Sequence, residues 1–265
     1  MASIWQGWAI VWVAMVFALA AAWTVARARR DAGIVDVVWS AGVGAATLFM
    51  ATRVAGYGPR VALVAAMAAI WSLRLAAYIY WDRIRPGRED GRYQALRARW
   101  GARADLYFLV FFESQSFLVV LFAAPITIAM AQPHPGWRAW DLVGLLLWLA
   151  AVAGESAADR QLARFRADPA RRGQTCAVGL WRYSRHPNYF FEWLHWWAYV
   201  AIGVGGPGWP ITWLGPAVML LFLFRVTGIP ATEARALASR GESYRRYQET
   251  TSAFIPWSPR RRDRS

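Results

Sequence analysis

Seven apolar stretches divide this sequence, and each is close to the length that an α-helix needs to cross a bilayer. A spanning helix takes about 20 predominantly apolar residues. Hydrophobic residues fill 57% of the 265 positions, which is above the share usual in water-soluble domains. The stretches are 4–26, 33–55, 59–81, 106–131, 139–158, 189–205 and 209–230. We therefore predict an all-α integral membrane protein with seven transmembrane helices.

The placement of arginine predicts the orientation of these helices independently. The chain has no lysine, so all 30 of its basic residues are arginines. Twenty-five of them follow the first, third, fifth and seventh stretches, at 27–30, 83–103, 160–185 and 235–264. Because cytoplasmic loops collect basic residues, we expect the N-terminus outside and the C-terminus in the cytoplasm.

The net charge of +14 does not indicate a protein that binds nucleic acid. Membrane topology and attraction to anionic lipid headgroups already account for most of the arginines. The single cysteine, Cys176, excludes an intrachain disulfide, and one thiol gives no metal-site spacing, so we expect no metal. No repeat or linker interrupts the chain, and we predict one integral membrane domain over 1–265.

The segment LWRYSRHPNYFFEW, residues 180–193, concentrates polar groups at the mouth of an apolar helix. Pro187 suits the first helical position, and Asn188, Glu192 and His195 then share one helical face. A membrane-edge cluster that only anchors the helix is the alternative. That alternative explains arginines at the membrane edge, but not a Glu and a His one and two turns deeper, where ionisable groups are usually functional.

Further polar groups are expected beside this segment on the cytoplasmic side. Glu155, Asp159, Leu162 and Arg166 form one helical stripe that leads from lipid to water. Pro230 should break the last apolar helix between Arg225 and Glu233. An Arg-rich loop contributes Asp82, Arg83 and Arg85. Together these groups would line a pocket for a polyanionic cofactor.

The N-terminal helices carry a second set of polar residues, in the pairs Asp36 and Trp39, Arg74 and Tyr78, and Glu113 and Gln115. A structural ion pair between Arg74 and Asp36 is one interpretation. In the functional interpretation, a carboxyl that burial keeps protonated donates a hydrogen bond or a proton to a substrate carbonyl. Both remain open on the sequence alone.

One sequence motif does not indicate a dinucleotide site. GVGGPG at 203–208 matches the dinucleotide fingerprint, but it follows a membrane helix and lacks the strand and helix that give the spacing its meaning. We interpret it as a loop, and any dinucleotide would bind without a Rossmann domain.

At these residues the chain resembles the steroid 5-alpha reductase family, most strongly over 150–257, through the stripe, the RHPNY-F-x-E pattern and the terminal GESYRRYQETTSAFIPW. Isoprenylcysteine carboxyl methyltransferases share RHPxY, whereas Glu192, Asp159 and Asp36 favour the reductase. The resemblance implies NADPH-dependent reduction of the Δ4 double bond of a 3-oxo steroid or a similar lipophilic enone. It also implies a protein of the bacterial inner membrane whose cofactor site faces the cytoplasm.

The resemblance assigns roles residue by residue. Asp159, Arg166 and Asn188 match nucleotide-binding positions, and Arg225 matches an arginine of helix seven. Glu155 stands where animal members have asparagine, while Ile229 and Glu233 replace a histidine and a tyrosine. The full predicted cofactor set is Arg83, Arg85, Glu155, Asp159, Arg166, Tyr183, Arg185, His186, Asn188, Glu192, Arg225 and Glu233.

The substrate would occupy the half formed by helices one to four, 1–131, and the cofactor the half formed by helices five to seven, 139–257. Animal members hold the ketone with a Gln-Glu pair and a tyrosine; here Asp36 is the nearest carboxyl and Trp71 occupies the tyrosine position. We predict Asp36, Glu113 and Tyr78 as catalytic residues. The predicted substrate-binding residues are Trp39, Trp71 and Gln115. A membrane methyltransferase using S-adenosylmethionine and a non-enzymatic lipid-binding protein are the alternatives, and the oligomeric state is open.

Overall fold

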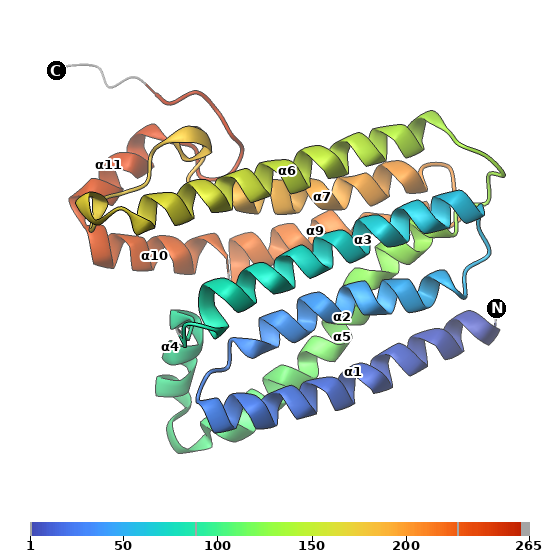
Figure 1. Ribbon diagram of the computed structural model, residues 1–265, viewed down its shortest axis with the longest axis horizontal. Helices are drawn as coiled ribbons and strands as arrows, with labels where there is room; N and C mark the ends of the chain where they lie inside the picture. Colours follow the sequence, from blue (N-terminus) through green and yellow to red (C-terminus); the bar gives the residue numbers. More distant parts are fainter. Residues whose placement is uncertain (1, 88, 227, 261–265) are drawn as a thin grey trace. The chain divides into compact units, whose positions relative to one another are not determined.

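The computed structural model describes residues 2–87, 89–226 and 228–260, and most of them lie in helices (Figure 1). No β-strand occurs in these ranges, where an isolated bridge joins Ser184 and Ser252. The predicted all-α class is therefore confirmed.

Six helical segments among the described residues are long and apolar enough to cross a membrane, which supports a multi-pass membrane protein. They are Ile4–Arg29, Ile34–Ala51, Gly58–Ile84, Gly91–Met130, Ala139–Ala167 and Trp209–Arg240. The helix α7, Pro187–Gly203, has 17 residues. At 1.5 Å per residue it is about 25 Å long, shorter than a typical hydrocarbon core of about 30 Å. The count of seven spans and the orientation of the termini stay predictions.

The chain falls into two compact units. Unit 1 comprises Met1–Asp141 and Tyr199–Leu214, and unit 2 comprises Leu142–Ala198 and Gly215–Ser265. Unit 1 contains α1 (Ala2–Arg29), α2 (Ile34–Ala51), α3 (Gly58–Ile79), the π-helical turn η1 (Tyr80–Ile84), α4 (Gly91–Trp100), η2 (Gly101–Arg103), α5 (Ala104–Met130) and α8 (Trp209–Thr212). Unit 2 contains most of α6 (Ala139–Ala167), then η3 (Pro169–Arg171), η4 (Gly179–Arg182), most of α7, α9 (Leu214–Leu221), η5 (Phe222–Val226), α10 (Ile229–Arg240) and α11 (Glu242–Thr250).

Small residues let the helices of unit 1 approach closely. Helix α2 packs against α1, α3 and α5. The backbone N–H of Gly44 on α2 donates to the Ser72 hydroxyl on α3 over 3.1 Å, and that hydroxyl donates to the carbonyl oxygen of Ser40. A Cβ at Gly44 would collide with Ser72. Small and hydroxylated residues are typical of membrane helix interfaces for this reason.

A buried ion pair fixes the chain between α5 and α6 within unit 1. Arg60 is fully buried, and its Nε and Nη2 donate to the Asp141 carboxylate over 2.9 and 3.0 Å. Its Nη1 donates to the carbonyl oxygens of Gln132 and His134 over 3.0 and 2.9 Å. A side chain near the start of α3 therefore holds the 132–141 connection.

Helices α6 and α7 of unit 2 lie side by side (Figure 1). A Cβ at Gly154 on α6 would overlap the Phe191 ring of α7, so only glycine allows this packing. The Trp181 indole N–H, in η4 just before α7, donates to the carbonyl oxygen of Ala158 over 2.9 Å. These contacts bring the polar stripe of α6 beside the start of α7.

The last predicted helix, 209–230, is interrupted in the structure. Helix α9 continues as the π-helical turn η5 to Val226, and a new helix, α10, begins at Ile229. Pro230 lies in the first turn of α10, where its missing N–H leaves no hydrogen bond unmade. The predicted break near Pro230 is confirmed. The GVGGPG motif lies in the turn between α7 and α8, as interpreted from the sequence.

Two helices occupy segments that we interpreted as loops. Helix α4 follows η1, and α11 follows the left-handed Gly241 (φ +52°) after α10. Both are rich in arginine and polar residues, so a search for apolar spans does not detect them. The loop interpretation of these segments is wrong.

Candidate cofactor site

A buried polar cluster joins α6 to α7 at the predicted site. Glu155 and Asp159 of α6 are each only 5% exposed. The Asn188 side-chain amide, in the first turn of α7, donates to the Asp159 carboxylate over 3.2 Å. Buried carboxylates are costly unless they accept hydrogen bonds. Asn188 and Asp159 are 29 positions apart in the sequence, and the structure brings them into direct contact.

The stripe of α6 ends at the surface, as its spacing predicts. One turn beyond Asp159, Leu162 packs against a small cluster formed by Phe165, Cys176 and Trp181. One turn further, Arg166 is exposed. Burial raises the pKa of the Cys176 thiol, so this thiol stays protonated and uncharged at physiological pH.

The RHP segment forms a closed network with the C-terminal helices. Arg185 Nε donates to Glu233 Oε1 over 2.7 Å, and Arg185 Nη1 donates to the carbonyl oxygens of Gln248 and Thr251 over 3.0 and 2.6 Å. His186 Nε2 lies 3.2 Å from the same Glu233 oxygen. The Gln248 amide donates to the other Glu233 oxygen over 2.8 Å.

Backbone contacts close this network. The Tyr247 hydroxyl of α11 donates to the carbonyl oxygens of Trp181 and, over 3.1 Å, Ser184. Burial raises the pKa of the Tyr247 phenol, which keeps it neutral and able to donate. The Arg185 N–H donates to the carbonyl oxygen of Ser252 over 2.8 Å. The C-terminal segment thereby fixes the residues that precede Asn188.

This arrangement changes the roles open to three predicted cofactor residues. Arg185, His186 and Glu233 satisfy one another, so within unit 2 they position the start of α7. Tyr183 is 41% exposed, and its carbonyl oxygen accepts from the Trp257 N–H over 2.9 Å. Arg225 is exposed in η5 and makes no ion pair in the ranges that the structure describes.

We expect Glu233→Gln to lower the free energy of unfolding by about 1–3 kcal/mol, because the Arg185 side chain, 11% exposed, loses its carboxylate partner. Thermal unfolding in detergent measures the change. Glu242→Gln is the matched control, since the Glu242–Arg246 pair is exposed (side chains 62% and 61%) and such pairs contribute little. We call the Arg185–Glu233 ion pair the clamp. Equal melting temperatures for the two variants would show that the clamp does not stabilise the fold.

In unit 1, Asp36 of α2 takes part in an ion pair. Its carboxylate accepts from the Tyr93 hydroxyl over 2.7 Å and from Arg92 over 3.1 Å. A pair with Arg74 was one of the two interpretations of the sequence, and the structure supplies Arg92 from α4 as the partner. Burial alone would raise the pKa of neighbouring Asp90, but the Arg92 and Arg83 guanidinium groups outweigh it and hold that pKa below its usual range.

The two predicted cofactor arginines of unit 1 have local partners. Arg83 lies 2.7 Å from Asp90 and 3.8 Å from Asp82. The Arg85 guanidinium lies over the Trp81 ring, 4.5 Å from its centroid. Both therefore already make favourable contacts within unit 1.

The remaining predicted residues of unit 1 lie on three helices. Trp71 of α3 is fully buried, and Tyr78, two helical turns further along the same helix, is half-buried. The Trp39 indole N–H is buried, with no hydrogen-bond partner in the described part of the chain. Glu113 is half-buried on α5, and the Gln115 amide reaches the Ser114 hydroxyl at 3.4 Å.

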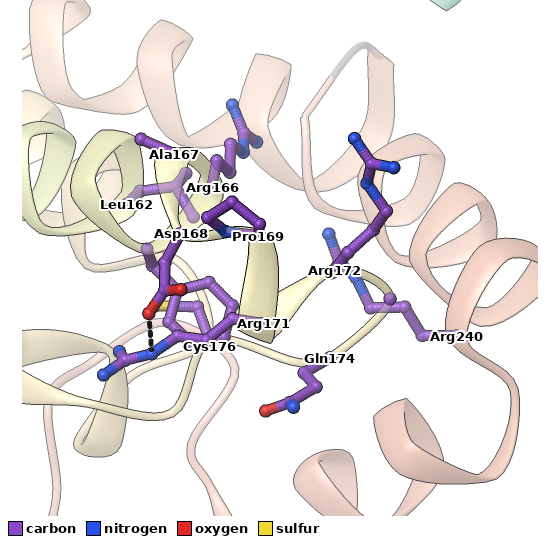
Figure 2. A pocket seen from close by; sticks show the side chains of 12 residues that line it. Leu162, Arg166, Ala167, Asp168, Pro169, Arg171, Arg172, Gln174, Cys176 and Arg240 are labelled. Atoms are coloured by element: carbon purple, nitrogen blue, oxygen red, sulfur yellow. Dashed lines mark ion pairs between the residues drawn. The ribbon is translucent and has the colours of Figure 1, made fainter.

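Sequence reasoning missed Tyr93, Tyr247 and the arginines of a pocket beyond α6. That pocket has a volume of about 240 Å³ and is lined from α6, the 168–174 loop and α10 (Figure 2). Arg166 is the predicted site residue within it, and Arg171, Arg172 and Arg240 join it. The adjacent arginines in DPARRGQ were the available signal.

Comparison with known proteins gives the family of the chain. Residues 22–251 match the family described as protein of unknown function (DUF1295). The chain is 28% identical over 266 residues to the uncharacterized protein C594.04c of Schizosaccharomyces pombe, covering 88% of this chain and 75% of that protein. No solved structure matches. Because the match spans most of its length, the chain belongs to the DUF1295 family.

Proposed function

We propose that this protein uses NADPH to reduce the carbon–carbon double bond of a lipophilic enone such as a 3-oxo-Δ4 steroid. The observation that carries the proposal is the hydrogen bond between Asn188 and Asp159, 3.2 Å long. These two residues match nucleotide-binding positions of the steroid 5-alpha reductases, to which the DUF1295 family is related.

The chemistry of the residues in unit 2 fits a dinucleotide. Buried carboxylates such as those of Glu155 and Asp159 can accept hydrogen bonds from ribose hydroxyls or a carboxamide. Exposed guanidinium groups such as Arg166 suit phosphate oxygens. When bound, NADPH supplies a hydride. The chain's own residues would bind and orient it, with Asn188 held in place through the clamp of Arg185 and Glu233.

The substrate side of the proposal rests on unit 1. A hydrogen-bond donor near the substrate ketone stabilises the negative charge that develops on its oxygen. The buried Trp39 N–H, which has no partner among the described residues, would supply such a donor. Asp36 is one helical turn away on α2 and contacts the Tyr93 phenol. The apolar helices of this unit would accept a flat lipophilic substrate from the bilayer.

Cofactor choice separates this proposal from its rivals. We expect NADPH to raise the melting temperature of the detergent-purified protein, whereas S-adenosylmethionine should not. Stabilisation by S-adenosylmethionine alone would favour a methyltransferase. Stabilisation by neither compound would favour the third alternative, a non-enzymatic lipid-binding protein.

We expect Asn188→Ala and Arg166→Gln each to weaken NADPH binding about tenfold or more, since hydrogen bonds to charged groups are worth about 1.5–3 kcal/mol. Titration of each variant with NADPH measures the dissociation constant. Arg164→Gln is the matched control, because Arg164 is an exposed arginine of the same helix that does not line the pocket. Unchanged affinity in both site variants would remove the assignment.

A further inference from the structure

The pocket beyond α6 collects more positive charge than its own carboxylate can neutralise. Four arginines line it: Arg166 at the end of α6, Arg171 and Arg172 in the following loop, and Arg240 at the end of α10. Asp168 is its one lining carboxylate, and it lies 3.0 Å from Arg171 (Figure 2). Arg171 also stacks over the Phe165 ring, 5.2 Å from its centroid.

The other three arginines keep their charges available. Arg166, Arg172 and Arg240 form no ion pair with any residue that the structure describes. The remaining polar lining group is Gln174, and the buried Cys176 contributes a neutral wall. The pocket therefore combines one internally neutralised arginine with three guanidinium groups that lack a counter-charge.

A purely structural explanation covers only part of this arrangement. Arg166 and Arg240 lie in the last turns of α6 and α10, where a cation interacts favourably with the helix dipole. Arg171 is held by Asp168 and the Phe165 ring, but Arg172 has no such structural reason to line the cavity. Like charges that line one hollow repel one another. A bound anion would relieve that repulsion. Guanidinium groups match phosphate oxygens in geometry and charge.

We infer that this pocket binds a phosphate group, with Arg166, Arg172 and Arg240 as its charged donors and Asp168 holding Arg171 at the rim. Two sources supply this chemistry. One is the phosphate monoester of a nucleotide, and that source rests on the proposed function. The other is the headgroup of an anionic lipid, because the pocket lies at the end of the membrane-span candidate Ala139–Ala167.

Binding of inorganic phosphate to the full-length protein in detergent tests the pocket itself. We expect the double variant Arg172→Gln with Arg240→Gln to weaken phosphate binding at least tenfold. Arg164→Gln with Arg235→Gln is the control: it removes the same charge from exposed positions outside the lining, on α6 and α10, and should bind as the parent does. Asp168→Asn should tighten binding, since it removes the pocket's only carboxylate. Equal loss in both double variants, or no phosphate binding by the parent, would overturn the inference.

Two further arms identify the source of the phosphate. NADP⁺ compared with NAD⁺ isolates the nucleotide monoester, and nanodiscs of phosphatidic acid compared with phosphatidylcholine isolate the lipid headgroup. A preference for NADP⁺ that the Arg172→Gln, Arg240→Gln variant loses supports the nucleotide source. A preference for phosphatidic acid lost in the same variant supports the lipid source. Phosphate binding with no nucleotide binding would keep the pocket and reject the proposed function.

Discussion

Asp141→Asn should lower the free energy of unfolding by about 3–5 kcal/mol, because it leaves the Arg60 guanidinium buried without its counter-charge. Arg60 is fully buried, and Asp141 is 2% exposed. The three carbonyl acceptors of the 132–136 segment remain, but they do not neutralise the cation. Thermal unfolding in detergent should show a large decrease in melting temperature.

An exposed ion pair of the same unit provides the control for this prediction. Arg27 and Asp105 lie 3.0 Å apart with side chains 61% and 49% exposed. Arg27→Gln should therefore cost less than about 1 kcal/mol. Replacing both buried partners, as in Arg60→Met with Asp141→Leu, should recover much of the loss, because no unpaired charge remains. If the Asp141→Asn and Arg27→Gln variants had the same melting temperature, the buried pair would not be a determinant of stability.

Loss of the donor that polarises the substrate ketone should lower kcat about two to three orders of magnitude while NADPH affinity is retained. The sequence named Asp36 first, with Glu113 and Tyr78 as the other predicted residues. In the structure the Asp36 carboxylate accepts from the Tyr93 hydroxyl and from Arg92, so Asp36 would act by positioning these donors. The structure adds Tyr93, whose hydroxyl donates to Asp36. We therefore expect the large decrease in Asp36→Asn, measured by steady-state reduction of a 3-oxo-Δ4 steroid.

The Tyr93→Phe variant tests whether Asp36 and Tyr93 act together or independently. If Asp36 and Tyr93 act as one unit, the double variant should lose no more rate than the worse single variant. Independent roles would instead give losses that multiply. Parental rates in Asp36→Asn, Glu113→Gln and Tyr78→Phe alike would show that the donor lies elsewhere.

Apolar length predicted the helices well and their polar extensions poorly. The stretch 139–158 continues to Ala167 in the structure, because the polar residues after Ala158 still favour a helix and place Leu162 and Phe165 on its packed side. Helix α11 was missed since its mean composition is polar, although Tyr244 and Tyr247 form one buried face. A boundary drawn from apolar composition marks the end of the apolar segment, and the helix can continue beyond it.

The candidate site shows a similar division between local and distant information. Helical spacing correctly related Asp159 to Arg166, since the face of a helix is fixed by local geometry. It could not show that Arg185 pairs with Glu233, 48 residues away. The choice of Arg92 over Arg74 as the partner of Asp36 likewise depends on how α4 folds back within unit 1, across 56 residues.

Transfer of deuterium from NADPH deuterated at the nicotinamide C4 tests the central claim most directly. Purified protein is incubated with a 3-oxo-Δ4 steroid and each of the two deuterated diastereomers, and the product is examined by mass spectrometry. We expect the reduced steroid to carry one deuterium from one diastereomer and none from the other, and Asn188→Ala to reduce the yield. Product without deuterium from either diastereomer, or no reduced product from any enone tested, would contradict the account.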